Sequence, residues 1–227
     1  TILGKDFDKK YLDKVKTLSL SPEAIQKEHD LRIVFTPLHG TTYELVPASL
    51  RNWGFTNIHT VPEQSIPNGD FPTVASANPE EPAAFKMALD LARKIDADLA
   101  MACDPDGDRI GIAVKNDAGE WTLLNGNQTN IIFTEYIIRR KKELNQLKGG
   151  EYTVKTIVTT ELIKDIAEKN HIICYDVYTG FKWIADIIRK EGGEKFIGGG
   201  EESFGYMPGA FTRDKDGVSA TSLMAEI

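Results

Sequence analysis

The sequence has little of what marks a membrane, secreted or disulfide-stabilised protein. Its 227 residues contain no apolar run of eighteen, so no membrane-spanning helix is expected. The first residues, TILGKDFDKK, lack the basic and apolar regions of a secretory signal peptide. The two cysteines, Cys103 and Cys174, both stand in apolar, strand-like runs, so a disulfide framework is not expected and a reducing, cytoplasmic setting fits.

Positive charge is also scarce. Lys and Arg number 27 against 34 Asp and Glu, which gives a formal net charge of −7. This balance argues against a general nucleic-acid binder or a protein of the membrane surface, although it allows a locally positive pocket. The chain begins with Thr1 rather than Met, and we expect it to be part of a longer protein.

Strand-like and helix-like segments alternate along the chain. Apolar runs predict strands at 32–37, 57–61, 98–102, 109–114, 153–159, 171–177 and 195–200. Helices are predicted around 11–20 and at 79–95, 127–148, 161–170, 179–190 and 217–227. This alternation indicates layered α/β domains with largely parallel sheets. We assign residues 1–122 to a first domain and 123–227 to a second.

Two helix ends carry specific signals. The helix at 79–95 begins PEEP, so we expect acidic residues in its first turn, where negative charge interacts favourably with the helix dipole. The helix at 127–148 is expected to stop at Gly149 and Gly150. Between the strands and helices of the first domain, residues 62–79 are rich in Pro, Asn and Gly and predict a long loop.

The most informative stretch is ACDPDGDRIGIAV, in which Asp104, Asp106 and Asp108 alternate and Arg109 follows. An EF-hand is excluded, because the positions for its glycine and final glutamate hold Arg109 and Lys115. A phosphatase with an aspartate nucleophile and a plain charged hairpin stay open as minor alternatives. The favoured hypothesis is a hard divalent cation such as Mg²⁺, with Arg109 placed to pair with a phosphate.

Two further stretches are candidates for ligand loops. GGGEESFGY, residues 198–206, is a glycine-rich segment that carries carboxylates and a hydroxyl, which suit the hydroxyl groups of a sugar; a plain turn is about equally supported. TPLHGTT, residues 36–42, follows a strand and by itself indicates a routine strand-to-helix turn. His39 in that stretch could act as a base, but a single loop histidine usually does not.

Taken together, DPDGDRIGIAV, GGGEESFGY, TPLHGT and YTGFKWI resemble the α-D-phosphohexomutases, the phosphoglucomutase and phosphomannomutase family. The similarity extends over essentially the whole chain and is most specific in the first two stretches. The family has four domains, and this chain resembles the second and third. The resemblance therefore implies two tandem three-layer α/β/α domains with mixed, mostly parallel sheets.

The resemblance also implies a metal site. Asp104, Asp106 and Asp108 match the family's Mg²⁺ ligands, and Arg109 matches the arginine beside them, near the transferred phosphate. Such an enzyme interconverts the 1-phosphate and the 6-phosphate of a hexose, glucose or mannose, by way of a phosphoserine and a bisphosphorylated sugar. A phosphopentomutase of the same family is the alternative.

Sugar-binding positions of the family are matched in two loops. The matching residues are Gly200, Glu201, Ser203, Thr179, Gly180 and Lys182. Glu201 and Ser203 match the residues that hold sugar hydroxyls, and Gly200 lets their loop approach. The other three lie in the loop that helps to select which end of the sugar faces the phosphate.

Two parts of such an enzyme are not found in this sequence. No motif like TASHNP, which carries the family's catalytic serine, occurs; the nearest string holds Ser76-Ala77-Asn78-Pro79 and lacks the histidine. A phosphate-binding string of the RxSGT type is also absent. We therefore expect flanking domains to supply both parts and the chain alone to be inactive. An independent phosphatase and a non-catalytic sugar- or metal-binding module remain as alternatives from other classes.

Overall fold

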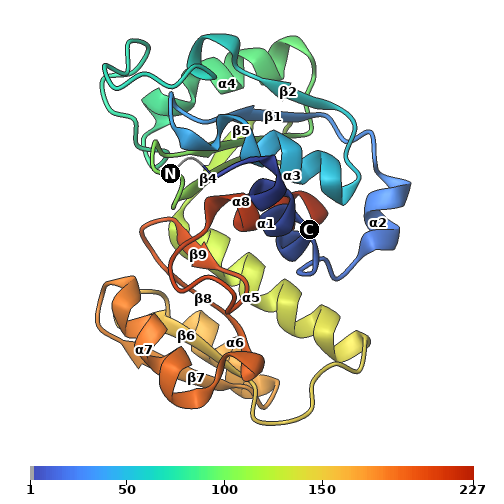
Figure 1. Cartoon of the computed structure of the whole chain (residues 1–227), viewed down its shortest axis with the longest axis vertical. Helices are drawn as coiled ribbons and strands as arrows, with labels where there is room; N and C mark the ends of the chain where they lie inside the picture. The colour runs from blue at the N-terminus through green and yellow to red at the C-terminus, as the bar shows by residue number, and fades with distance from the viewer. Residues whose placement is uncertain (1–2) are drawn as a thin grey trace.

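The computed structural model describes residues 3–227, in which the strands form two separate mixed sheets (Figure 1). The first sheet has the order β2-β1-β3-β4-β5 and the second β7-β6-β8-β9. The strands of the first sheet are β1 (Ile33–Thr36), β2 (Ile58–Thr60), β3 (Leu99–Cys103), β4 (Ile110–Lys115) and β5 (Trp121–Leu124). Those of the second are β6 (Tyr152–Thr156), β7 (Ile173–Val177), β8 (Phe196–Glu201) and β9 (Gly205–Met207).

Parallel pairs form one side of each sheet, and antiparallel pairs form the other. β1 pairs in parallel with β2 and β3, whereas β4 pairs antiparallel with β3 and β5. β6 pairs in parallel with β7 and β8, and β9 is an antiparallel edge strand. The predicted mixed and mostly parallel α/β architecture is confirmed.

Helices cover both faces of the sheets. They are α1 (Lys5–Lys16), α2 (Pro22–Lys27), α3 (Leu45–Trp53), α4 (Pro82–Lys94), α5 (Gly126–Glu143), α6 (Leu162–Lys169), α7 (Phe181–Glu191) and α8 (Gly217–Glu226). Along residues 3–227, none of these helices has the length and apolar character needed to cross a membrane.

The alternation of side chains along β3 explains the layers of the first sheet. Leu99, Met101 and Cys103 belong to the core cluster that includes α3 and α8, and Ala100 and Ala102 belong to the cluster formed with α4. Successive side chains of a strand point to opposite faces, so the sequence LAMAC buries both faces of β3. The three layers of the first unit are therefore α4, the sheet, and α3 with α8.

The C-terminal helix α8 crosses from the second unit to the first. It packs on α3 of the first unit, and Figure 1 shows it in the upper half of the molecule, although the strands that precede it belong to the other sheet. Every residue of α8 is buried, and the hydroxyls of Ser49 on α3 and Ser222 on α8 lie 2.7 Å apart. The predicted boundary between 122 and 123 also falls inside β5. The division of the chain at that point stays a prediction, and the two units share a core.

The predicted helix ends differ from the observed ones. α4 begins at Pro82, so Glu80 and Glu81 precede it and do not lie in its first turn. α5 ends at Glu143, before the glycines expected to stop it, and Asn145 then adopts a positive φ of 56°. The predicted start of α4 was wrong because residues 78–80 form an Asx turn before the helix. The predicted end of α5 was wrong because Asn145, like a glycine, tolerates the left-handed conformation that follows a helix.

A buried carboxylate in α8 joins three parts of the chain. Glu226 accepts hydrogen bonds from the hydroxyl of Tyr136 on α5 (2.8 Å), from the backbone N–H of Leu20 (2.8 Å) and from the hydroxyl of Ser19. A buried carboxylate needs such donors because it has lost its hydration. These bonds hold α8 against α5 and the segment that follows α1.

We predict that Tyr136→Phe lowers the free energy of unfolding by about 1–3 kcal/mol, because it removes a hydrogen-bond donor to a buried charged group. Tyr178→Phe is the matched control, since the Tyr178 side chain is 68% exposed. Urea denaturation of both variants measures the difference. Equal stability of the two variants would show that the Glu226 network does not hold α8 in place.

Candidate functional site

The three aspartates of the loop between β3 and β4 converge on one point. One carboxylate oxygen from each of Asp104, Asp106 and Asp108 lies within 4.8 Å of the others. Asp104 is buried, Asp108 is half-buried and Asp106 is exposed, so the cluster opens to solvent on one side. Three carboxylate oxygens this close are a donor set that Mg²⁺ and similar hard cations prefer.

Backbone hydrogen bonds fix the buried member of this cluster. The Oδ1 atom of Asp104 accepts from the N–H groups of Asp108 (3.0 Å) and Arg109 (2.9 Å). The loop thus wraps around the Asp104 carboxylate and turns the following aspartates toward it. One Asp104 oxygen is bonded to the backbone, which leaves the other oxygen for a cation.

The electrostatics of the cluster favour a proton when no cation is bound. Burial is the main cause that raises the pKa of the Asp104 carboxyl to about 7, and the neighbouring carboxylates of Asp108 and Asp106 act in the same direction. The backbone bond from Arg109 opposes this shift. A divalent cation would remove the like-charge repulsion that helps to raise the pKa, so the residues fit such an ion chemically.

Glycines bring the TPLHGTT segment against the aspartate loop. The N–H of Thr41 donates to the carbonyl of Pro105 (2.8 Å). A Cβ atom on Gly40 would lie 2.3 Å from the Cα of Pro105, so only glycine allows this approach. Gly107 has a φ of +78°, and a Cβ there would meet Thr42 at 2.5 Å. The segment therefore supports the shape of the aspartate loop.

His39 is structural in this arrangement. Its Nδ1 lies 3.1 Å from the carbonyl oxygen of Ile66 and its Nε2 lies 2.8 Å from the hydroxyl of Thr73. Both partners belong to the long predicted loop at 62–79. His39 is buried, and both of its ring nitrogens lie within hydrogen-bond distance of this loop, so its side chain holds the loop in place. This agrees with the expectation that a single loop histidine does not act as a base.

The sugar-binding candidates lie where β8 and β9 meet the start of α7. The buried Glu201 accepts a hydrogen bond from the N–H of Gly180 (2.5 Å), which joins the two predicted sugar loops. Ser203 is half-buried, whereas Thr179 and Lys182 are exposed. The Lys182 ammonium lies 5.2 Å from the centre of the Trp183 ring.

Gly200 has a packing reason to be glycine. A Cβ atom there would lie 2.0 Å from Oδ1 of Asn130 on α5 and 2.7 Å from the carbonyl of Gly205. Asn130 in turn donates to the carbonyl of Glu201 (2.9 Å). Gly200 therefore allows β8 to lie close to α5, and this contact fixes the backbone of Glu201.

The structure joins the aspartate loop to the sugar loop. The N–H of Ile110, which directly follows Arg109, donates to the carbonyl of Phe204 (3.0 Å), and the N–H of Gly217 donates to the carbonyl of Gly107 (3.0 Å). A Cβ on Gly126 would lie 1.8 Å from the carbonyl of Glu202, so the start of α5 also abuts the sugar loop. The two motifs, distant in sequence, therefore meet at one junction between the sheets.

Sequence reasoning missed two charged residues at this junction. The Lys215 ammonium lies 2.8 Å from Oδ2 of Asp108 and 5.0 Å from the centre of the Phe181 ring. Burial acts to lower the pKa of Lys215, but its bond to Asp108 outweighs this, and the pKa stands above the ordinary value. Glu80 bonds to Arg109 at 2.8 Å. The charged string RDKDG was the only signal for Lys215, and Glu80 was interpreted as part of a helix.

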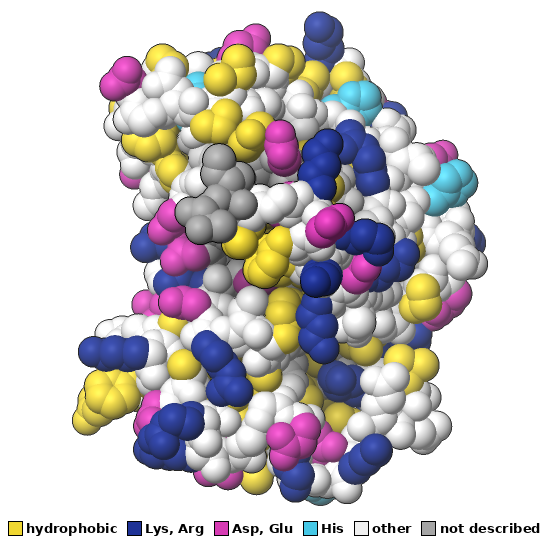
Figure 2. Space-filling model, viewed as in Figure 1, with side chains coloured by type: hydrophobic (Ala, Val, Ile, Leu, Met, Phe, Trp, Pro, Cys, Tyr) yellow, Lys and Arg dark blue, Asp and Glu magenta, His cyan; other side chains and the backbone are white. Residues whose placement is uncertain are grey.

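Charged groups of both signs are visible around this region. Figure 2 shows acidic and basic side chains close together at the left edge, where the upper and lower halves of the molecule meet. At the candidate site, Asp108 pairs with Lys215 and Arg109 pairs with Glu80. The candidate site therefore combines three carboxylates, a donor set suited to a cation, with the positively charged side chains of Arg109 and Lys215.

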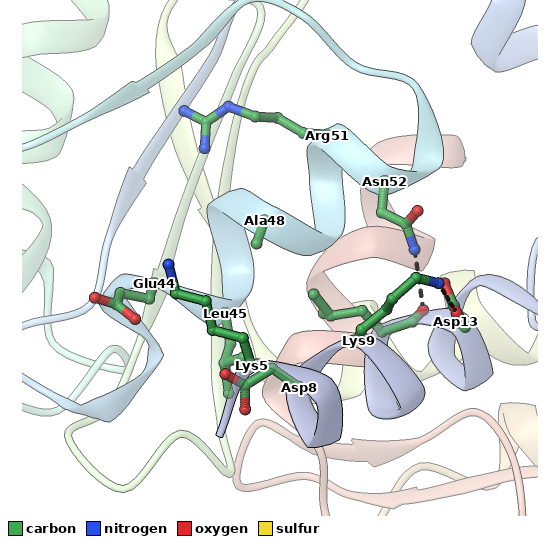
Figure 3. A pocket seen from close by; sticks show the side chains of 10 residues that line it. Lys5, Asp8, Lys9, Asp13, Glu44, Leu45, Ala48, Arg51 and Asn52 are labelled. Atoms are coloured by element: carbon green, nitrogen blue, oxygen red, sulfur yellow. Dashed lines mark hydrogen bonds and ion pairs between the residues drawn. The ribbon is translucent and has the colours of Figure 1, made fainter. Parts of the chain in front are cut away.

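A separate groove of about 520 Å³ lies between α1 and α3 (Figure 3). None of the predicted site residues lines it. Some of its polar side chains already bond to protein: Lys9 pairs with Asp13 at 2.5 Å, and the side chain of Asn52 donates to the carbonyl of Leu12 at 3.2 Å. Because none of the predicted site residues lines this groove, we do not assign the active site to it.

Comparison with known proteins gives consistent matches to one family. Residues 9–119 match the model of "Phosphoglucomutase/phosphomannomutase, alpha/beta/alpha domain II", and residues 125–227 match that of domain III. The chain is 36% identical over 227 residues to a phosphoglucomutase of Staphylococcus saprophyticus and 39% identical over 196 residues to one of Staphylococcus aureus. These matches cover 99% and 86% of this chain but 40% and 35% of those proteins.

A solved structure supports the same fold. The crystal structure of a putative phosphomannomutase from Thermus thermophilus matches with a TM-score of 0.76 at 22% identity, over 96% of this chain and 46% of that one. The chain thus spans less than half the length of the relatives that it matches.

The raised pKa of Asp104 predicts that the affinity for Mg²⁺ depends on pH. Below about pH 7 the ion must displace the Asp104 proton, so the affinity should rise about tenfold per pH unit toward pH 7 and then level off. Calorimetric titration of the chain with Mg²⁺ from pH 5 to pH 8 measures this. An affinity that stays constant over this range would contradict it, and Asp70→Asn, in an exposed loop, is the control.

Proposed function

Because this chain belongs to the phosphoglucomutase/phosphomannomutase family, we propose that it supplies the metal-binding and sugar-binding parts of an enzyme that interconverts hexose 1-phosphates and hexose 6-phosphates. The substrates would be phosphates of glucose or mannose. The nucleophilic serine and the main phosphate-binding loop would come from other parts of the enzyme. The free cysteines Cys103 and Cys174 support a reducing cytoplasm as its location.

The observation that carries this proposal is the junction of the two loops. A mutase must hold a phosphoryl group and a sugar hydroxyl next to each other, since transfer depends mainly on position and on charge stabilisation. The bond from Ile110 to Phe204 places the aspartate loop directly beside the loop of Glu201 and Ser203. A cation-binding module or a sugar-binding module alone would not need both loops in contact.

The residues of the chain divide the work by their chemistry. Asp104, Asp106 and Asp108 would hold Mg²⁺, and the ion would neutralise charge on the transferred phosphoryl group. Arg109 and Lys215 supply positive charge within 4 Å of this cluster. Both are suited to orient phosphate oxygens while the sugar is bound.

The hydroxyl groups of the sugar would be held by hydrogen bonds to a carboxylate and to a side-chain hydroxyl. The Glu201 carboxylate accepts one bond from Gly180 and keeps further acceptor capacity for hydroxyl groups of a sugar. Ser203 adds a hydroxyl that can donate or accept. Thr179, Gly180 and Lys182 are proposed to line the side of the pocket that distinguishes the two ends of the sugar phosphate.

We predict that the 227-residue chain alone converts no hexose 1-phosphate to hexose 6-phosphate, because the sequence carries no phosphorylated-serine motif of the family. A coupled assay with glucose 1-phosphate and glucose 1,6-bisphosphate, on chain purified away from host mutases, measures this. Steady conversion would contradict the proposal. Hydrolysis to free glucose and phosphate would instead support a phosphatase.

A pair of substitutions in the full-length gene product separates the two loops. Glu201→Gln should lower kcat/KM roughly ten- to a hundredfold, because a neutral amide accepts sugar hydroxyls less well than a carboxylate. It should leave the Mg²⁺ concentration for half-maximal activity unchanged. Asp108→Asn should raise that concentration, since it removes a ligand charge.

Activity measured against Mg²⁺ at saturating sugar phosphate distinguishes these outcomes. If Glu201→Gln shifts the Mg²⁺ midpoint as far as Asp108→Asn does, Glu201 belongs with the metal ligands and the proposed division is wrong. Glu202→Gln is the neighbouring control, because the Glu202 carboxylate bonds to Thr156 and Thr159 within the second unit. It should leave the Mg²⁺ midpoint unchanged.

A further inference from the structure

Arg109 is placed beside the aspartates but is held by a different carboxylate. Its Nε lies 3.7 Å from Asp104 and 3.8 Å from Asp108, which are ion-pair distances without a hydrogen bond. Its Nη1 donates to Oε1 of Glu80 at 2.8 Å. Within residues 3–227 this is the one hydrogen bond of the guanidinium, so most of its five N–H donors remain available to a ligand.

Glu80 lies in a hydrogen-bonded turn that fixes the position of its backbone. The side chain of Asn78 accepts from the N–H of Glu80 (3.0 Å), and the carbonyl of Asn78 accepts from the N–H of Glu81 (3.0 Å), which forms a tight turn before α4. Pro79 packs on β4, where a Cβ on Gly111 would lie 2.7 Å from its carbonyl oxygen. The backbone of Glu80 is therefore fixed relative to the strand that follows Arg109.

Without Glu80, the nearest anions for Arg109 would be the metal ligands themselves. Guanidinium and carboxylate groups favour bidentate pairing, and Arg109 is already within 4 Å of two aspartates. Such a pair would neutralise the carboxylates that a cation requires. It would also use the donors that a phosphate requires.

We propose that Glu80 is a positioning residue, which holds Arg109 off the aspartate cluster so that the cluster can bind a divalent cation and the guanidinium can face a phosphate. This inference rests on the proposed function. Glu80 itself touches neither the cation nor the sugar in this account. It acts through Arg109, and its effect should disappear when the guanidinium is removed.

A double-mutant cycle on the chain tests this, with Mn²⁺ as the probe. Glu80→Gln should raise the dissociation constant for Mn²⁺ about three- to tenfold, because Arg109 then pairs with the aspartates. In the Arg109→Gln background the same substitution should change it by less than about twofold. Glu80→Asp should recover part of the affinity, and Glu81→Gln, at the exposed neighbouring position, should have no effect.

The NMR signal of the Arg109 Nε–Hε group, assigned by its loss in Arg109→Gln, gives a second readout without metal. It should shift in Glu80→Gln and not in Glu81→Gln. An unchanged signal, or an equal loss of Mn²⁺ affinity in both backgrounds, would overturn the inference. A wild-type chain that binds no Mn²⁺ would contradict the proposed function, and the Arg109 signal would still decide the role of Glu80.

Discussion

Mutual repulsion among three carboxylates is the constraint on which the candidate site depends. Asp104, Asp106 and Asp108 are forced together by a loop whose own N–H groups grip Asp104. In this structure burial and this repulsion together raise the pKa of Asp104, and the Lys215 ammonium pairs with Asp108. A bound divalent ion, as proposed, would reduce this repulsion further.

The second unit brings the proposed sugar-binding loop against the aspartate loop. Gly200 lets β8, which ends at Glu201, lie against Asn130 of α5. The carbonyl of Phe204 then accepts a hydrogen bond from the N–H of Ile110, which follows the aspartate loop. α8 returns to the first unit and completes its core, with Glu226 tied to Tyr136 and Leu20. Backbone and side-chain hydrogen bonds therefore hold the two loops together at the junction, as the proposed reaction would require.

Much of the fold and the composition of the site could be predicted from the sequence. Apolar runs predicted strands at the positions of β1 to β4 and β6 to β8, but not the edge strands β5 and β9. The spacing of the aspartates indicated their convergence. The positions of Lys215 and Glu80 could not be predicted, because each reaches the site through a contact between segments far apart in the chain. The tight turn at Asn78 and the return of α8 across the boundary are tertiary effects that local patterns do not encode.

The central claim is that the cation site and the sugar loop form one site. Paramagnetic broadening by Mn²⁺ in the NMR spectrum of the labelled chain measures this directly, because the effect falls steeply with distance from the ion. The account predicts that amide signals of Asp106, Arg109, Ser203 and Phe204 broaden together at substoichiometric Mn²⁺, and that Asp108→Asn abolishes this effect. Broadening of the aspartate loop with sharp signals from 203–204, or broadening centred elsewhere, would contradict it.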